Sequence, residues 1–299
     1  MENNVINDRY TLRTKIGHGG YATVFLAYDN IYSRFVAIKV VNCKADPSNK
    51  TYIMFKQEAM TLAAISNPNI VKVYEDGVFE DKPYLVMEYV KGKSLKDIIL
   101  ENGYLLVDEV FIYMQQIING LEAIHNAKIV HRDIKPNNII KKNDGSLVLI
   151  DFGTAIISDA SYNLYKEDGS TIIGTVQYMA PELVNNTMGS SQTDIYALGV
   201  SMYEMFTGKF PFSLPDKNDK IGVVQMHINE PFPSVRKLNP NVPVSFENII
   251  YKCCEKSCKK RYKNINELRV DLLRAYEEYK NPKTKKVSFL RKIFKRKRK

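Results

Sequence analysis

The stretch HRDIKPNNII, residues 131–140, places four charged or titratable side chains and two asparagines within ten positions. Ile134, Ile139 and Ile140 are interspersed among these polar residues. A solvated loop does not need isoleucines, and a core strand would not tolerate so many polar groups without hydrogen-bonding partners. We therefore predict a polar loop fixed on an apolar base, as a preorganised catalytic site requires. A hydrogen-bonded loop of no catalytic use is the alternative.

A second acidic motif, LVLIDFGTA at residues 147–155, follows closely. Its Asp151 ends an apolar run and comes eighteen residues after Asp133, which stands five residues before Asn138. A carboxylate and an amide oxygen that converge from two segments can hold Mg²⁺, which prefers oxygen ligands and phosphate. Asp133 is then available to orient a hydroxyl group and accept its proton, and Lys135 to neutralise charge on a moving phosphoryl group. The pattern predicts phosphoryl transfer.

A glycine-rich loop, IGHGGYATV at residues 16–24, joins two predicted strands. Gly17, Gly19 and Gly20 permit close approaches that a Cβ atom would prevent, and successive backbone N–H groups on such a loop form a concavity for phosphate. The loop is not a Rossmann fingerprint, because a strand follows it, and it lacks the Gly-Lys-Ser/Thr of a Walker loop. By itself it is weak evidence, because glycine-rich hairpins are common.

Lys39 is the only charged residue in the apolar run FVAIKVV. A lysine on an edge strand, with its ammonium reaching solvent, is the ordinary interpretation. The functional interpretation is a partly buried ammonium that contacts nucleotide phosphates. Such a group needs a carboxylate partner to offset desolvation, and Glu58 in FKQEAMTL is the candidate.

Composition sets the protein class. The 299 residues have ordinary apolar and charged fractions, and no run reaches the roughly 18–20 apolar residues that cross a bilayer. The start, MENNVINDRY, does not resemble a secretory signal, and four cysteines do not suggest a disulfide framework, so we expect a reducing cytoplasm.

Residues 283–299 hold ten Lys or Arg and no acid, which accounts for the whole net charge of +10. The remaining chain is neutral, so charge does not argue for specific nucleic-acid binding by the body.

Hydrophobic periodicity predicts an α+β protein with a small β-rich lobe, residues 10–90, and a larger helical lobe, residues 91–279. Residues 1–9 are an expected N-terminal extension and 280–299 an expected basic tail. The crevice between lobes is a favoured place for a ligand. The expected strands are 10–17, 22–29, 34–41, 70–80 and 83–90, with a helix near 52–65.

These motifs together resemble a eukaryotic-like (Hanks-type) protein kinase over roughly residues 10–279. The glycine loop, VAIK, HRDxKPxN, DFG and APE occur in the family's order, which is specific although each motif alone is weak. The resemblance implies a bilobal kinase fold, ATP with Mg²⁺ or Mn²⁺, and protein substrates. Lys135 and Thr175 resemble serine/threonine kinases, and the C-terminal pattern resembles the bacterial branch near the membrane-linked kinases that often carry PASTA repeats.

The resemblance also implies a role for each matching residue. Asp133 would be the catalytic base with Lys135 beside it, Asn138 and Asp151 would hold the metal, and Met87 would be the gatekeeper before a hinge at Glu88 to Val90. The implied ATP-binding residues are Ile16, Gly17, His18, Gly19, Gly20, Val24, Ala37, Lys39, Glu58, Met87, Glu88 and Val90.

Further positions are implied to be structural. Asp194 matches a buried aspartate that braces the catalytic loop, and Glu182 of APE matches a carboxylate that pairs with an arginine, here Arg261. Two departures stand out. Ala22 replaces the third loop glycine, and Ser257 with Cys258 replace an Asp-Pro ahead of the arginine.

Regulation is expected at the segment between Asp151 and Glu182. Arg132 would pair there with a phosphorylated residue, ordering the loop through charge-assisted hydrogen bonds after autophosphorylation. Mere loop composition is the alternative for these hydroxyl groups. The candidates for phosphorylation are Ser170, Thr171 and Thr175, with Ser158 and Ser161 also in the segment.

The tail, residues 283–299, has Phe289, Leu290, Ile293 and Phe294 at helical spacing among its basic residues. This pattern predicts a helix on the anionic inner face of the cell membrane, so the expected location is cytoplasmic and peripheral to, or anchored at, that membrane. A solvated tail or binding to nucleic-acid phosphates are the alternatives.

The sequence leaves a dimer partner and three alternative interpretations to consider beside an active kinase. A homodimer through the small lobe is implied by similar bacterial kinases. A pseudokinase scaffold is disfavoured because Lys39, Glu58, Asp133, Asn138 and Asp151 are all present. A membrane- or nucleic-acid-binding module with a secondary kinase fold is disfavoured by the neutral body. A zinc site at Cys253, Cys254 and Cys258 lacks a fourth ligand at suitable spacing.

Overall fold

The computed structural model describes residues 5–18, 22–152, 156–157, 176–185, 189–214, 216 and 219–282. Backbone proximity divides the chain into two compact units. The first unit is Met1–Ile98 with Asn119–Gly174, and the second is Ile99–Ile118 with Thr175–Lys299. The predicted lobe boundary near residue 90 rests on secondary structure and stays a prediction, whereas proximity groups the catalytic-loop sequence with the β-rich part of the chain.

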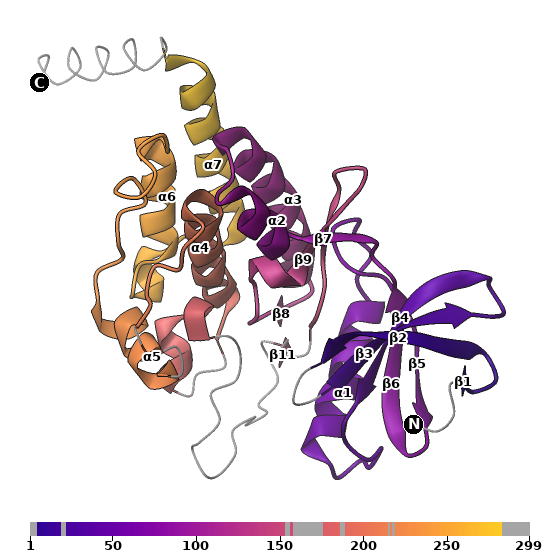
Figure 1. The fold of residues 1–299 in the computed structure, drawn as a ribbon. Helices are drawn as coiled ribbons and strands as arrows, with labels where there is room; N and C mark the ends of the chain where they lie inside the picture. The colour runs from indigo at the N-terminus through magenta and orange to yellow at the C-terminus, as the bar shows by residue number, and fades with distance from the viewer. Residues whose placement is uncertain are drawn as a thin grey trace, which may run out of the picture. The chain divides into compact units, whose positions relative to one another are not determined.

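The first unit is built on a six-stranded antiparallel sheet with the order β1-β2-β3-β4-β6-β5. Helix α1 (Lys50–Ala63) packs against β5 and β6 (Figure 1). The predicted strands and helix are confirmed, with small shifts at their ends. The strand bounds are β1 (Val5–Ile6), β2 (Tyr10–His18), β3 (Ala22–Asp29), β4 (Arg34–Val41), β5 (Val73–Phe79) and β6 (Lys82–Glu88).

Strand β4 is central in this sheet, between β3 and β6, and six consecutive residues from Val36 to Val41 are buried. A strand covered in this way reads as a continuous apolar run rather than an alternating one. The interpretation of Lys39 as an edge-strand lysine is therefore wrong, because its side chain starts from the middle of the sheet.

The start of the sheet reaches into the expected N-terminal extension. Val5 and Ile6 pair with Thr11 and Tyr10 of β2, and Ile6 is fully buried in the core of the sheet. Arg9 donates through Nε and one terminal nitrogen to both carboxylate oxygens of the fully buried Asp29, each at 2.9 Å. Hydrogen bonding to this guanidinium holds the pKa of Asp29 down at about 2. The pair fixes the β3–β4 turn to the beginning of β2.

A second, smaller sheet in the first unit has the order β10-β9-β7. It joins β7 (Gly92–Ser94) to the hairpin of β9 (Ile139–Lys142) and β10 (Leu147–Leu149). The 3-10 turn η1 (Pro136–Asn138) precedes β9, and β8 (Ile129–Val130) pairs with β11 (Ile156–Ile157).

Asn69, in the segment between α1 and β5, joins that segment to the smaller sheet of β10, β9 and β7. Its side-chain amide donates to the carbonyl of Leu147 at 2.8 Å, and its own carbonyl accepts from the backbone N–H of Leu149 at 2.8 Å. The N–H of Val71 returns a bond to the carbonyl of Leu149 at 2.9 Å. These bonds attach the chain after α1 to β10, in agreement with the grouping of residues 119–174 in the first unit.

The second unit is helical, as the sequence predicts, and is built around α4 (Ser191–Thr207) (Figure 1). Every residue of α4 from Thr193 to Phe206 is buried. A Cβ on Gly199 would lie 2.5 Å from the Cβ of Cys253, so glycine permits α4 to pack closely against α6. The α+β class, with strands first and helices later, is confirmed.

The remaining elements belong wholly or partly to the second unit. In the described part of the chain, no helix combines the length and the hydropathy that a membrane span requires. Helices α2 (Leu95–Asn102) and α3 (Val107–Asn126) have residues in both units. The other elements of the second unit are η2 (Val176–Tyr178), η3 (Pro181–Asn185), α5 (Lys220–Asn229), α6 (Val244–Cys253), η4 (Cys258–Lys260) and α7 (Ile265–Lys280).

Candidate active site

A cavity of about 490 Å³ lies within the first unit. Its lining comes from β2, β3, β4 and α1, from the end of β6 and the residues that follow it, and from the segments around η1, β9 and residues 150–152. Twelve residues that the sequence predicts for nucleotide or metal line it. They are Ile16, Gly17, His18, Val24, Ala37, Lys39, Glu58, Met87, Glu88, Val90, Asn138 and Asp151.

Lys39 lines this cavity and contacts two carboxylates there. Its Nζ donates to Glu58 Oε1 at 2.8 Å and to Asp151 Oδ1 at 3.1 Å. The Lys39 and Glu58 side chains are nearly buried, whereas that of Asp151 is half exposed. Burial alone lowers the pKa of Lys39, but the two carboxylates outweigh it and raise the pKa above its usual value. Lys39 therefore remains an ammonium at neutral pH.

The contact between Lys39 and Glu58 is the one that the sequence predicts. Glu58 lies on α1, and the neighbouring Ala59 and Phe55 are buried beside it. The helix is thus held with its carboxylate toward β4 by apolar packing. Removing Lys39 would leave the Glu58 carboxylate without its counter-charge, and removing Glu58 would leave Lys39 with the half-exposed Asp151 alone.

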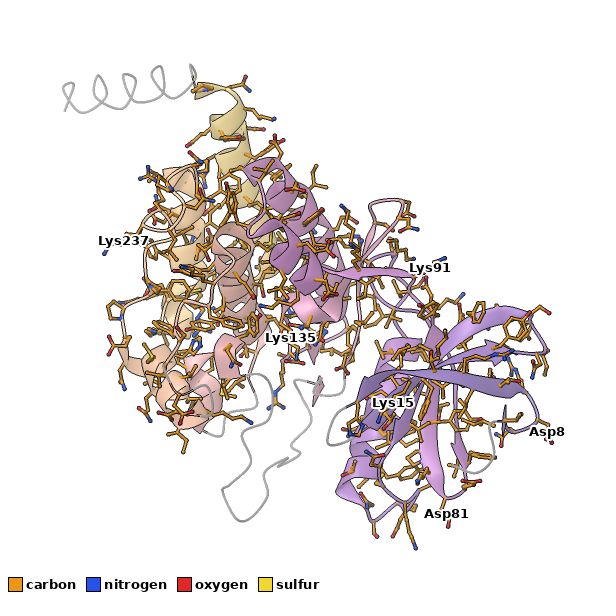
Figure 2. The ribbon with its side chains drawn as sticks, viewed as in Figure 1. Asp8, Lys15, Asp81, Lys91, Lys135 and Lys237 are labelled. Carbon is orange, nitrogen blue, oxygen red and sulfur yellow. The ribbon has the colours of Figure 1, made fainter. Side chains whose placement is uncertain are left out.

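The stretch 131–140 forms a tightly bonded loop next to the cavity. Lys135 Nζ donates to Asp133 Oδ2 at 2.6 Å, and the Asn138 amide donates to the same oxygen at 2.9 Å and to the Asp133 carbonyl at 2.9 Å. Figure 2 labels Lys135, which comes from this loop. Ile134 and Ile139 are fully buried. The predicted arrangement of polar groups on an apolar base is present.

Two residues of this region have left-handed backbones, which non-glycine residues rarely adopt. The φ angle is 67° at Arg132 and 64° at Asp151. Packing supports them: the rings of His131 and Phe152, both fully buried, lie 4.5 Å apart between centroids. Backbone strain of this kind costs about 1–3 kcal/mol per residue and clusters at functional sites.

The oxygen groups fit a magnesium-type ion. Asn138 and Asp151 both line the cavity, and they offer an amide oxygen and a carboxylate that is half exposed beside Lys39. This set lacks the thiolate and imidazole ligands that zinc prefers. Among the described residues, no group of three or more His, Cys, Asp or Glu is arranged to hold a metal ion, and Cys253 and Cys254 are buried thiols.

Seven further residues line the cavity. Two of them lie in segments that the sequence predicts for the nucleotide, since Ala22 takes the place of the third loop glycine and Tyr89 is in the hinge from Glu88 to Val90. Ile150 and Phe152 flank Asp151, and Leu62 lies one helical turn after Glu58, so signals existed for these three as well. Val71 and Ile140 depend on which strands meet. The seven are Ala22, Leu62, Val71, Tyr89, Ile140, Ile150 and Phe152.

Several predicted residues do not belong to the described part of the chain. Gly19, Gly20 and the phosphorylation candidates Ser158, Ser161, Ser170, Thr171 and Thr175 lie outside it, as does the tail 283–299. Asp194 is fully buried in the first turn of α4. Its role in bracing the catalytic loop stays a prediction.

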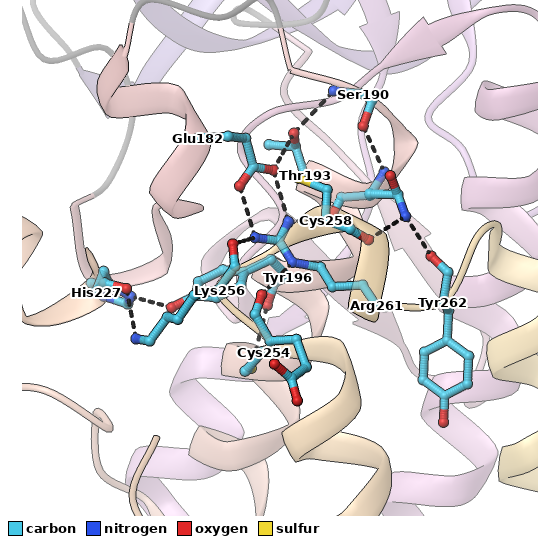
Figure 3. Close-up of polar contacts among 12 residues, drawn as sticks. Glu182, Ser190, Thr193, Tyr196, His227, Cys254, Lys256, Cys258, Arg261 and Tyr262 are labelled. Carbon is cyan, nitrogen blue, oxygen red and sulfur yellow. Dashed lines mark hydrogen bonds and ion pairs between the residues drawn. The ribbon is translucent and has the colours of Figure 1, made fainter. Parts of the chain in front are cut away.

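The second unit contains the predicted pair of Glu182 and Arg261 (Figure 3). Two terminal nitrogens of Arg261 donate to the two Glu182 oxygens at 2.7 and 2.8 Å. The other guanidinium hydrogens reach the carbonyls of Glu255, Gln192 and Lys256 at 2.7–3.2 Å. Burial alone would raise the pKa of Glu182, but Arg261 and Thr193 outweigh it and lower the pKa. Glu182 is thus a largely buried carboxylate that stays ionised.

Comparison with known proteins agrees with this geometry. The family model described as protein kinase domain matches residues 10–270, so the chain belongs to the protein kinase domain family. The chain is 36% identical over 272 residues to serine/threonine-protein kinase PrkC of Bacillus subtilis, covering 91% of this chain and 41% of that protein. It is 34% identical over 270 residues to probable serine/threonine-protein kinase PknB of Lactococcus lactis, covering 90% and 42%.

A third relative, serine/threonine-protein kinase PknB of Mycolicibacterium smegmatis, is 32% identical over 278 residues, covering 91% of this chain and 44% of that protein. The chain therefore spans about two fifths of the length of the curated relatives it matches. The predicted likeness to bacterial serine/threonine kinases is confirmed.

The Glu182–Arg261 pair generates a prediction about stability. We expect Arg261→Met to lower the free energy of unfolding by about 3–5 kcal/mol, because it leaves a buried carboxylate uncompensated. Urea denaturation at pH 7 measures this loss. Because Arg261 lowers the pKa of Glu182 below 4.5, its stabilisation is complete above that pH and is lost as the pH falls through the folded-state value. The difference between parent and variant should therefore narrow at pH 4.

Arg274→Met is the matched control, because the Arg274 side chain is exposed and its ion pair with Asp271 is a surface pair. Such pairs contribute about 0–1 kcal/mol. Equal losses in the two variants would contradict the assigned importance of the buried pair.

Proposed function

We propose that this chain transfers the γ-phosphoryl group of ATP to serine and threonine hydroxyl groups of proteins. The observation that carries the proposal is the cavity in which one ammonium, on Lys39, meets the carboxylates of Glu58 and Asp151. A buried cation next to a half-exposed carboxylate suits a nucleotide polyphosphate with its metal ion. Membership of the kinase family supports the same activity.

Each part of the cavity has a role in this proposal. Lys39 binds the α- and β-phosphates, while Gly17 and the glycines after it cover them. A Cβ at Gly17 would make only an ordinary 3.5 Å contact with Val24, so packing within the protein does not require glycine there and a ligand is the better reason. Met87 and the backbone of Glu88 to Val90 accept the adenine.

Asn138 and Asp151 hold the divalent cation, which is Mg²⁺ or Mn²⁺ in our proposal. The cation would neutralise phosphate charge and fix the nucleotide's geometry. Protein side chains then position the acceptor. Asp133 orients the substrate hydroxyl group and accepts its proton, and Lys135 stabilises charge on the transferred phosphoryl group. The bonds from Lys135 and Asn138 to Asp133 hold that carboxylate in one orientation before substrate arrives.

Two other functions are weaker. A pseudokinase scaffold usually lacks at least one of the polar side chains that transfer requires. All five are present, and Lys39 contacts two of the others, Glu58 and Asp151. The five are Lys39, Glu58, Asp133, Asn138 and Asp151. A nucleic-acid-binding module finds no support in the neutral charge of residues 1–282.

The proposal extends to control of the enzyme. Ser170, Thr171 and Thr175 would be autophosphorylated, and the new charge would bind Arg132 and order the loop. The tail 283–299 would lie on an anionic membrane surface, which makes the protein cytoplasmic and peripheral to the membrane. These proposals rest on sequence patterns, because the residues concerned are outside the described part.

A homodimer through the β-rich part is proposed on a structural observation. Ile31, Tyr32 and Phe35 at the β3–β4 turn are 54–66% exposed. Large apolar side chains that gather on a small surface often mark an interface. The turn that carries them is held rigid by the Arg9–Asp29 ion pair.

Kinase activity is tested with Asp133→Asn and Lys39→Ala. We expect each to reduce phosphate transfer from radiolabelled ATP by about a hundredfold to a thousandfold or more, because general-base and electrostatic contributions are of that size. Circular dichroism serves as the folding control.

Mass spectrometry of the parent should find phosphate between residues 158 and 175, and Asp133→Asn should lack it. A parent with no transfer activity, or a variant as active as the parent, would refute the proposal.

The tail is tested by flotation with vesicles. The full chain should float with vesicles that contain phosphatidylserine and remain behind with phosphatidylcholine alone, since each basic residue near an anionic surface contributes about 1 kcal/mol. A chain that ends at Pro282 should lose the binding. Equal flotation of the two chains removes the membrane proposal.

The dimer is tested by sedimentation over a range of concentrations. Tyr32→Asp should shift the parent's dimer to monomer, because the charge would be buried at the interface. Ile221→Asp is the matched control, since Ile221 is equally exposed but lies in the second unit. A parent that is monomeric at every concentration would contradict the dimer.

A further inference from the structure

The hinge between β6 and β7 is joined twice to one lysine of strand β9. The hinge begins at Glu88, the last residue of β6, and ends at Gly92, the first residue of β7. At its beginning, Lys142 Nζ donates to Glu88 Oε1 at 2.8 Å. At its end, Gly92 is the register partner of the same Lys142. Only three residues, 89–91, lie between the two attachments, and Figure 2 labels Lys91 among them.

The backbone contact at the hinge's end is unusually close. A Cβ on Gly92 would lie 2.1 Å from the carbonyl oxygen of Lys141, so no other residue fits without separating β7 from β9. Glu88 is likewise fixed from the other side, because its N–H donates to the carbonyl of Lys72 at 2.8 Å and its register partner in β4 is Val36. The Glu88 side chain is therefore the polar link from the six-stranded sheet to β9.

Strand β9 also forms a wall of the cavity. Side chains alternate along a strand, so Ile140 and Lys142 project from one face and Lys141 from the other. Ile140 lines the cavity, as do Glu88, Tyr89 and Val90 of the hinge. The Glu88–Lys142 ion pair thus ties the hinge to the strand that carries Ile140. The pair lies beside the slot between the hinge and Ile140. Glu88 is the register partner of Val36, three residues before Lys39 along β4.

We propose that Lys142 is a positioning residue for nucleotide binding, which acts through Glu88 to hold the hinge at a fixed distance from Ile140. The inference rests on the proposed function, because the ligand of the slot is then the flat adenine base. The lysine needs no contact with the nucleotide. Its effect falls on the base and leaves the phosphate end, where transfer occurs, unchanged.

The test compares Lys142→Met with the matched control Lys141→Met in the full chain. Calorimetry measures the dissociation constants of ADP and of adenosine, and a transfer assay gives KM for ATP and kcat. Lys142→Met should raise KM and both dissociation constants by the same factor, about two- to fivefold for a partly exposed ion pair, with kcat unchanged. Lys141→Met should leave all of them unchanged. Thermal unfolding shows whether each variant is folded.

Adenosine has no phosphate, so its binding distinguishes a positioning role of Lys142 from a direct contact between Lys142 and phosphate. If Lys142 acted on phosphates directly, its removal would weaken ADP but not adenosine, and that result overturns the proposal. Glu88→Gln should reproduce the effect of Lys142→Met, and the double variant should be no worse than either, because both remove one link. Additive losses, or unaltered adenosine binding in Lys142→Met, also overturn it.

Charge exchange is the rescue experiment. The pair Glu88→Lys with Lys142→Glu should bind adenosine more tightly than either single variant, since it restores the ion pair in reverse. Failure of the parent itself to bind ADP and adenosine would refute the proposed function. A parent that binds both, with variants that bind equally well, refutes only the role of Lys142.

Discussion

The ammonium of Lys39 and its two carboxylates form the interaction on which the candidate site depends. Lys39 comes from the middle of the sheet, Glu58 from α1 and Asp151 from the segment after β10, so three distant stretches are joined at one nitrogen. Taking an ammonium out of water is costly unless opposite charge is close. The two carboxylates supply that charge, and the net result is a raised pKa for Lys39. The cation is thus permanent, and the side of the cavity where it stands is suited to phosphate.

The same constraint recurs in the second unit with other residues. Arg261 is buried, and all five of its guanidinium hydrogens have acceptors, two of them on Glu182. Arginine suits such a place because its planar fork matches a carboxylate and several carbonyls at once. The pair is formed although Ser257 and Cys258 stand where Asp-Pro is expected. The backbone carbonyl of Cys258 accepts from the Gln192 side chain at 2.7 Å.

The charged and the apolar residues that line the cavity have different proposed roles. Lys39, Asn138 and Asp151 line the cavity and would meet phosphate and metal, while Ala37, Val24 and Ile140 give the same cavity apolar surface. The Glu88–Lys142 pair is the polar element for which we infer a positioning role. In our proposal, the charged groups bind the reacting phosphates. The fixed distance between the hinge and Ile140 positions the flat adenine base. The two functions can therefore change independently.

The sequence alone determined the chemistry: which residues are acid, amide and ammonium, the order of the motifs, and strands β2, β3 and β4 nearly to the residue. These features are local, because hydrophobic periodicity and turn residues act over a few positions. The contact of Lys39 with Glu58 was also predictable, because a partly buried ammonium needs a carboxylate partner and Glu58 lies in the next helix. The central position of β4 was not predictable, and it shows that Lys39 is not on an edge strand. Val71, Ile140 and the link from Lys142 to Glu88 were decided only by tertiary structure. They depend on which strands pair and in what register, and that is set by packing between residues about fifty positions apart in the sequence.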